Sequence, residues 1–291
     1  MTCIAYADDI CLFASSKAAL ETMISDCIRG FEKAGLSTGL DKTFWTSTSC
    51  TPNETMSVSG HTLKWSEHIT FVGAKVQMCR HSGLTMAHRI QAATSVFEKW
   101  SSILCDATLP LEQRVKCFRS SVLSSVQWQS GSWTLTKAQA AHLQSWGARL
   151  HARMMNIRQS EFEDMGQYWR RLHRAGHKCM ADFNSSPLIA HLVQKHRMAG
   201  HFARLNGDEV VSKVLSCRDL SWWRSQQELW QQRGDKWGGV HSRRFNCWRW
   251  EQSLENDFGI VARPPHLQPH EVGWKRVAQD REAWKLHEPR L

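Results

Sequence analysis

The chain has 291 residues, of which 42% are hydrophobic and 22% are charged, so it can bury a core and is not a disordered chain. No stretch approaches the roughly 18 apolar residues of a membrane span, and no secretory leader is recognisable, so we expect no membrane partner. Thirty-seven Lys and Arg against 27 Asp and Glu give a net charge of +10, which favours a polyanionic partner such as a nucleic acid.

The first residues of the chain predict a β-hairpin. Apolar runs over 3–7 and 10–14 flank Asp8 and Asp9, which places two carboxylates at the tip. Adjacent carboxylates repel each other unless a cation lies beside them. We therefore favour a divalent metal site over the alternative, a turn that merely contains Asp.

An amphipathic helix is predicted next, capped by Ser15 or Ser16 and ended by Gly35. A turn then leads to the strand-like residues 44–46. Residues 58–63 and 69–76 predict another pair of short strands. The order hairpin, helix, strand, hairpin indicates an α+β unit.

From about residue 86, apolar residues recur every three to four positions instead of every two, which predicts helices. Three apolar stripes cover residues 90–104, 111–126 and 138–157. Further helical segments are predicted near 161–181, 187–206, 219–233, 243–257 and 271–287. The fold is therefore predicted to be α+β and mostly helical.

Basic charge is concentrated in the second half of the chain. Residues 1–150 carry a net charge of +3 and residues 151–291 one of +7, and the second half holds 17 Arg and nine of the 15 Trp. Arg binds phosphate through paired N–H groups and Trp offers a flat face to a base, so this pattern favours nucleic-acid binding. The alternative is a helical core that contains Trp beside solvated Arg.

The ten Cys residues form no Cys-x-x-Cys pair, so neither a disulfide framework nor a zinc ribbon is predicted. His173, His177 and Cys179 come closest to a cluster of metal ligands, but no second close pair accompanies them. We therefore expect reduced thiols in an intracellular protein, nuclear or cytoplasmic.

Three motifs in the first half of the chain occur in a recognisable order. Residues 6–9 read Tyr-Ala-Asp-Asp, residues 35–43 form a Gly-Leu to Asp-Lys-Thr turn, and residues 71–73 read Phe-Val-Gly. Together they resemble the reverse transcriptases of non-LTR (LINE-type) retrotransposons. The second motif lacks the Asn that the family often has there.

Four later segments are similar to the same family in the same order. Residues 131–136 resemble part of its thumb, residues 197–201 and 248–251 resemble two further elements, and residues 278–284 resemble its terminal helix. The resemblance implies a partial palm over residues 1–80, a helical thumb over 81–160 and a basic Arg/Trp-rich helical region over 161–291.

The resemblance implies RNA-directed DNA synthesis by two-metal nucleotidyl transfer, with Asp8 and Asp9 in the Mg²⁺ site. Lys42 would assist the leaving pyrophosphate, or be a solvated lysine at a strand edge. Phe71, Val72 and Gly73 would grip the primer strand. The partners would be an RNA template, a DNA primer and, where the upstream palm and fingers are present, deoxynucleoside triphosphates.

In that family a third carboxylate and the fingers precede the hairpin. We therefore expect this chain to be a carboxyl-terminal fragment that is inactive as a polymerase by itself. The alternative is a non-catalytic remnant that binds nucleic acid through its basic helical region. The candidate nucleic-acid-binding residues are Arg149, Arg153, Arg158, Arg170, Arg171, Arg174, Arg243, Arg244, Arg249, Trp248 and Trp250.

Overall fold

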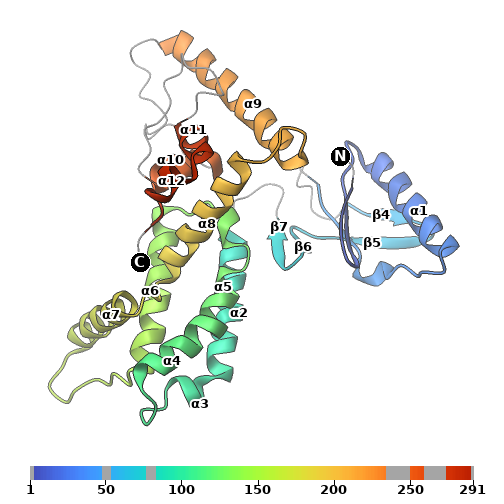
Figure 1. Cartoon of the computed structure of the whole chain (residues 1–291). Helices are drawn as coiled ribbons and strands as arrows, with labels where there is room; N and C mark the ends of the chain where they lie inside the picture. The colour runs from blue at the N-terminus through green and yellow to red at the C-terminus, as the bar shows by residue number, and fades with distance from the viewer. Residues whose placement is uncertain (1–2, 48–53, 77–82, 234–249, 259–272, 290–291) are drawn as a thin grey trace. The chain divides into compact units, whose positions relative to one another are not determined.

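The computed structural model describes residues 3–47, 54–76, 83–233, 250–258 and 273–289. It divides the chain into two compact units, 1–88 and 89–291 (Figure 1). All the described strands lie in the first unit, and the second is built from helices. The expected α+β, mostly helical class is therefore confirmed.

The first unit opens with the predicted hairpin. Strands β1 (Cys3–Tyr6) and β2 (Asp9–Leu12) pair antiparallel, with Tyr6 opposite Asp9. Ala7 adopts a positive φ of 51°, and this left-handed residue reverses the chain within two residues. The hairpin is a separate two-stranded sheet.

Helix α1 (Lys17–Lys33) follows as predicted. The hydroxyl of Ser16 accepts a hydrogen bond from the Ala19 N–H at 3.2 Å, so Ser16 is the N-cap. Gly35 lies just beyond the helix with a φ of 75°, a conformation that glycine adopts without strain. The core of this unit consists of Ile24, Ile28, Trp45, Met56, Val58 and Leu63.

The remaining strands form two further sheets. In the first, β3 (Phe44–Trp45), reached through the short helix η1 (Leu40–Lys42), pairs parallel with β5 (His61–Trp65). Strand β4 (Met56–Val58) pairs antiparallel on the other side of β5. In the second sheet, β6 (Ile69–Phe71) pairs with β7 (Ala74–Val76).

The prediction of one strand over 58–63 and another over 69–76 is wrong, because each stretch contains a turn. Ser59 and Gly60 have φ values of 50° and 77°, and Val72 and Gly73 have φ values of 47° and 74°. Two successive residues with positive φ close a tight hairpin. Each predicted strand therefore consists of the turn of a hairpin together with strand residues on both sides of that turn.

The second unit contains helices that follow the predicted apolar stripes. They are α2 (Gly83–Lys99, which begins in the first unit), α3 (Ser101–Leu104), α4 (Leu111–Phe118), the π-helical η2 (Arg119–Leu123), α5 (Ser124–Gln127), the short η3 (Ser130–Ser132) and α6 (Lys137–Met154). Buried Phe97, Phe118 and Leu143 belong to the core between them, and the Trp146 indole N–H donates to Thr94 Oγ1 at 3.0 Å.

Helix α7 (Met165–Asp182) packs along α6. Gly176 makes this contact possible, because a methyl group there would overlap the backbone of Ala148. The next helices are α8 (Pro187–Ala203) and α9 (Val210–Arg233), which begins nine residues before the predicted 219.

The last helices are α10 (Trp250–Asp257), α11 (Gly273–Gln279) and α12 (Arg281–Lys285), and they pack on α8 (Figure 1). Three late segments that are far apart in the sequence thereby share one core. Its buried members are Ala199, Trp250, Leu254, Phe258, Trp274, Ala278 and Trp284.

Two polar contacts fix this carboxyl-terminal core to α8. The ring of His196 stacks on Trp284 at 4.4 Å between centroids, and its Nε2 lies 2.8 Å from the Trp284 carbonyl oxygen. The buried Nζ of Lys195 lies 2.5 Å from Asp257 Oδ2 and 2.5 Å from Ser253 Oγ. Across the described ranges, no helix has the length and apolar character needed to cross a lipid bilayer.

Candidate metal and nucleic-acid sites

The candidate metal site is the turn of the β1–β2 hairpin. Asp8 lies in the turn and Asp9 begins β2, and both side chains are exposed. Among the described residues neither carboxylate has a hydrogen-bond or ion-pair partner. Two unpaired carboxylates offer the oxygen ligands that Mg²⁺ prefers.

This donor set fits only part of a magnesium site. In the described part of the chain, no group of three or more His, Cys, Asp or Glu side chains lies close enough together to hold a metal. Octahedral Mg²⁺ bound here would keep most of its ligands as water. The turn could therefore hold the ion weakly.

The hairpin that carries the two carboxylates is itself exposed. Tyr6 is 63% exposed, and Ile4 and Ile10 are also exposed although their strands are apolar in sequence. A two-stranded hairpin gains little stability by itself, because neither of its faces is well covered. The position of Asp8 and Asp9 therefore depends on local pairing and on the turn.

The other predicted catalytic and primer-gripping residues lie elsewhere in the first unit. Lys42 ends η1 and is exposed, and within the described ranges it forms no ion pair with Asp8 or Asp9. Phe71 ends β6, and residues 72–73 form the turn of the β6–β7 hairpin, a sheet separate from β1–β2. The roles predicted for these residues stay predictions.

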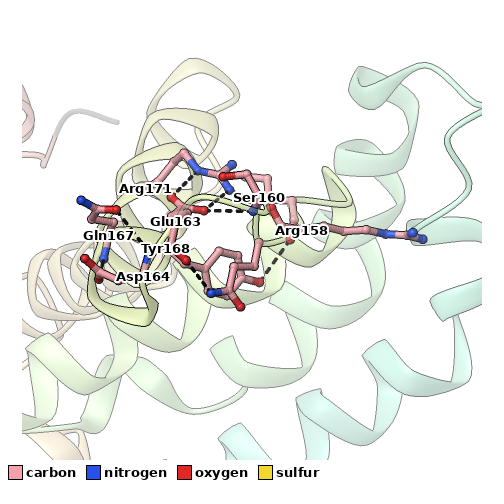
Figure 2. Close-up of polar contacts among 9 residues, drawn as sticks. Arg158, Ser160, Glu163, Asp164, Gln167, Tyr168 and Arg171 are labelled. Atoms are coloured by element: carbon pink, nitrogen blue, oxygen red, sulfur yellow. Dashed lines mark hydrogen bonds and ion pairs between the residues drawn. The ribbon is translucent and has the colours of Figure 1, made fainter.

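Arg171 belongs to a polar network at the start of α7 (Figure 2). Its Nε and Nη2 donate to the two carboxylate oxygens of Glu163 at 2.8 and 2.7 Å, and Nη2 also donates to the Arg158 carbonyl oxygen at 2.7 Å. These hydrogen bonds raise the pKa of Arg171 and lower that of Glu163. Arg171 therefore holds this loop in place, and its predicted role in nucleic-acid binding stays a prediction.

The same loop is fixed by two further interactions, which Figure 2 also shows. Asp164 caps α7 by accepting the Gln167 N–H at 2.7 Å, and the Gln167 amide oxygen accepts the Asp164 N–H at 3.2 Å. The Tyr168 hydroxyl donates to the Ile157 carbonyl oxygen at 3.2 Å. The side chain of Arg158 points away from this network.

Two more of the residues predicted to bind nucleic acid have hydrogen-bond partners within the chain. Arg153 donates to both carboxylate oxygens of Glu98 at 2.5 and 3.0 Å, so its charge is already paired. Trp250 is buried at 9% exposure, and its indole N–H donates to the Gly131 carbonyl oxygen at 2.7 Å. Burial in the carboxyl-terminal core removes the flat face that the stacking prediction required.

The remaining predicted arginines divide into two groups. Arg158, Arg170 and Arg174 are exposed and Arg149 is half-buried, and where the structure describes the chain none of these guanidinium groups has an acidic partner. Unpaired guanidinium groups keep their capacity to bind phosphate. Arg243, Arg244, Trp248 and Arg249 lie outside the described residues.

Sequence reasoning missed an aromatic row on α7. Trp169, His173 and His177 follow one another at intervals of four residues, and their neighbouring ring centroids lie 6.2 and 6.3 Å apart. The i, i+4 spacing was the available signal. Cys179 is buried on another face, where burial raises the pKa of its thiol to about 11, so it does not join the two His as a metal ligand.

No protein-family model, curated protein or solved structure matches this chain. Functional inference therefore depends on the residues and contacts of the molecule.

Proposed function

We propose that this chain is a fragment of a non-LTR retrotransposon reverse transcriptase that contains part of the palm, the thumb and the carboxyl-terminal region. Asp8 and Asp9 would be two of the carboxylates that hold Mg²⁺ for nucleotidyl transfer. The observation that carries the proposal is the pair of unpartnered, exposed carboxylates at a hairpin turn that is followed by an amphipathic helix. Bound Mg²⁺ would activate the primer 3′-hydroxyl and stabilise the leaving pyrophosphate.

The residues of this chain have limited tasks in that chemistry. Asp8 and Asp9 supply negative charge and oxygen ligands at the turn of the hairpin. Lys42 would supply a positive charge for the pyrophosphate if the substrate brings the two sites together. Because the described residues offer only two carboxylates at the turn, we expect little or no polymerase activity without a third ligand from another segment.

The experiment is a Mn²⁺ titration of the purified chain, with free Mn²⁺ measured by electron paramagnetic resonance. The wild type is expected to bind one ion with a Kd on the order of 1 mM, because two carboxylates and water bind such ions weakly. The double variant Asp8→Asn, Asp9→Asn should lose that ion. The matched control Asp41→Asn changes an exposed carboxylate in the same unit and should keep it.

Identical titration curves for the wild type and the double variant would remove the metal site from this chain. Primer extension on an RNA template with deoxynucleoside triphosphates then tests the reaction itself. Extension by the wild type that the double variant lacks would support the polymerase directly.

A second candidate function is nucleic-acid binding without catalysis. The unpaired guanidinium groups on and beside α6 and α7 favour it, since they are available to phosphate. This binding should weaken steeply as salt increases, because each phosphate contact releases a counterion. It should survive the double substitution of Asp8 and Asp9, and loss of binding in that variant would contradict an independent binding function.

A further inference from the structure

We infer that one face of α7 binds the unpaired bases of a single-stranded nucleic acid. Trp169 and the His rings that follow it would stack on bases, and Arg170 and Arg174 would bind the adjacent phosphates. The inference rests on the proposed nucleic-acid binding and is independent of the Asp8–Asp9 chemistry. We call residues 169, 170, 173, 174 and 177 the α7 stacking face.

The aromatic part of this face is a row of flat rings. Trp169 is 44% exposed, His173 is half-buried and His177 is exposed. The Trp169 and His173 rings are tilted by 39°, and the His173 and His177 rings are inclined by 30°. Base stacking needs such exposed π-faces and tolerates any base, because every base has a π-face.

The charged part of the face lies beside the rings. Arg170 and Arg174 each follow a ring residue by one position, so they form a parallel row on the helix. Both are exposed, and over the described ranges neither has an acidic partner. No Asp or Glu occurs between Asp164 and Asp182, so the face is basic along its whole length.

A third cation extends the face onto the neighbouring helix. Burial, followed by the charges of His177 and Arg149, holds the pKa of His173 below its usual value. Arg149 of α6 therefore lies close enough for its charge to act on the His173 ring. Arg149 therefore adds a third guanidinium group near the α7 stacking face, where it could bind a phosphate.

The α7 stacking face is presented by a helix that is held firmly from behind. Leu172, Gly176, Cys179 and Met180 form the buried side, and Gly176 brings the helix against the backbone of Ala148. The network of Arg171 and Glu163 fixes the first turns, as Figure 2 shows. A rigid support keeps the rings in place and lowers the entropy cost of binding.

Single strands are favoured over duplex by the combination of rings and charges. A duplex hides its base faces and would use the arginines only, whereas a single strand can use both rows. Fluorescence anisotropy with a labelled 12-nucleotide RNA, a DNA of the same sequence and the matching duplex tests this directly. The chain should bind both single strands more tightly than the duplex.

Trp169→Ala should weaken single-strand binding about tenfold, since the stacking of one base on an aromatic ring raises the affinity by about that factor. The control is Trp100→Ala, because Trp100 has a similar exposure of 42% and lies in the same unit, and it should change binding less than about twofold. Trp169→Phe keeps an aromatic face and should recover most of the affinity. Circular dichroism melting of each variant checks that it is folded.

Arg170→Gln with Arg174→Gln should weaken binding about tenfold and reduce the slope of log affinity against log salt by about 1.4 for a single strand. Arg119→Gln, an exposed arginine of the second unit, is its control. Equal binding by Trp169→Ala and Trp100→Ala, or equal binding of duplex and single strand, would overturn the inference. Binding that responds to neither α7 variant would leave the nucleic-acid function intact and refute this site.

Discussion

The two compact units differ in what their exposed and buried residues do. In the first unit the core is small, and the hairpin that carries Asp8 and Asp9 leaves Ile4, Tyr6 and Ile10 exposed. In the second unit aromatic rings are buried, and so are polar groups that have partners. Few packing contacts depend on the candidate metal ligands, whereas many depend on residues that have no expected chemical role.

Arg114 is an example of a buried polar group that has partners in the second unit. Its guanidinium is buried and donates to the carbonyl oxygens of Leu104, Leu109 and Met154. A buried cation of this kind is stable because backbone dipoles replace water. The second unit should therefore be far more sensitive to single substitutions than the turn at Asp8.

The largest effect is expected at the contact between α6 and α7. Gly176→Ala would push a methyl group into the Ala148 carbonyl, and backbone cannot move away as a side chain would, so we expect a loss of about 3 kcal/mol or more. Gly30→Ala is the control, because nothing lies within 4 Å of the new methyl group and α1 should gain about 0.5–1 kcal/mol. Urea unfolding measures both, and an unchanged midpoint for Gly176→Ala would contradict the close packing.

The next effect concerns the buried Lys195 of α8, which pairs with Asp257 of α10. Lys195 is 0% exposed, and burial lowers its pKa while Asp257 opposes that change. Asp257→Asn leaves the ammonium without a counter-charge and should cost about 3 kcal/mol in urea unfolding. Lys195→Met combined with Asp257→Leu removes both charges and should recover most of the loss. A harmless Asp257→Asn would show that water, not Asp257, solvates Lys195.

A smaller effect follows from the buried His151. Burial lowers the pKa of His151 to about 4, whereas the pKa of a histidine in the unfolded chain is near 6.5. In the folded chain its Nε2 lies 2.7 Å from Ser185 Oγ. The unfolded chain therefore takes up a proton that the native chain refuses, so stability is full above pH 6.5 and falls as the pH decreases towards 4. His151 should account for about 2 kcal/mol of loss by pH 5.

This pH effect can be assigned by comparing two variants in urea unfolding at pH 7 and pH 5. His151→Gln should reduce the difference in unfolding free energy between the two pH values. His142→Gln changes an exposed histidine and should leave that difference unchanged. The same difference in both variants would show that other groups dominate the acid response.

The smallest effect is expected at the candidate metal turn. Asp8→Asn with Asp9→Asn removes two exposed charges, so the unfolding free energy should change by less than about 0.5 kcal/mol. The same variant is expected to abolish Mn²⁺ binding. A stability loss of several kcal/mol would erase the contrast between the two units.

Local signals in the sequence were sufficient for much of the fold. The cap at Ser16, the glycine at 35 and the apolar spacing of α1 act within a few residues, so they could be predicted. The turns at 59–60 and 72–73 were missed although Gly60 and Gly73 were available as turn signals, because the neighbouring residues were interpreted as continuous strands.

The candidate nucleic-acid residues were harder to predict, because their roles depend on distant partners. Glu98 pairs with Arg153 across 55 positions, and Gly131 receives the Trp250 N–H across 119 positions. Composition identified a basic, aromatic region but could not show which members the core would bury. The row from Trp169 to His177 was accessible, since its spacing is local.

The wide turn η2 (Arg119–Leu123) joins α4 to α5 and has a consequence for chain length. A π-turn holds about one residue more than an α-turn, and here the hydroxyls of Ser120 and Ser121 donate to the Cys117 carbonyl oxygen at 3.0 and 2.7 Å. Buried Phe118 directly precedes this turn, and buried Val122 lies within it. Deletion of the exposed Ser120 should therefore restore a regular helix with the same buried face. Deletion of one residue is therefore expected to be tolerated at this turn and to be disruptive elsewhere between 111 and 127.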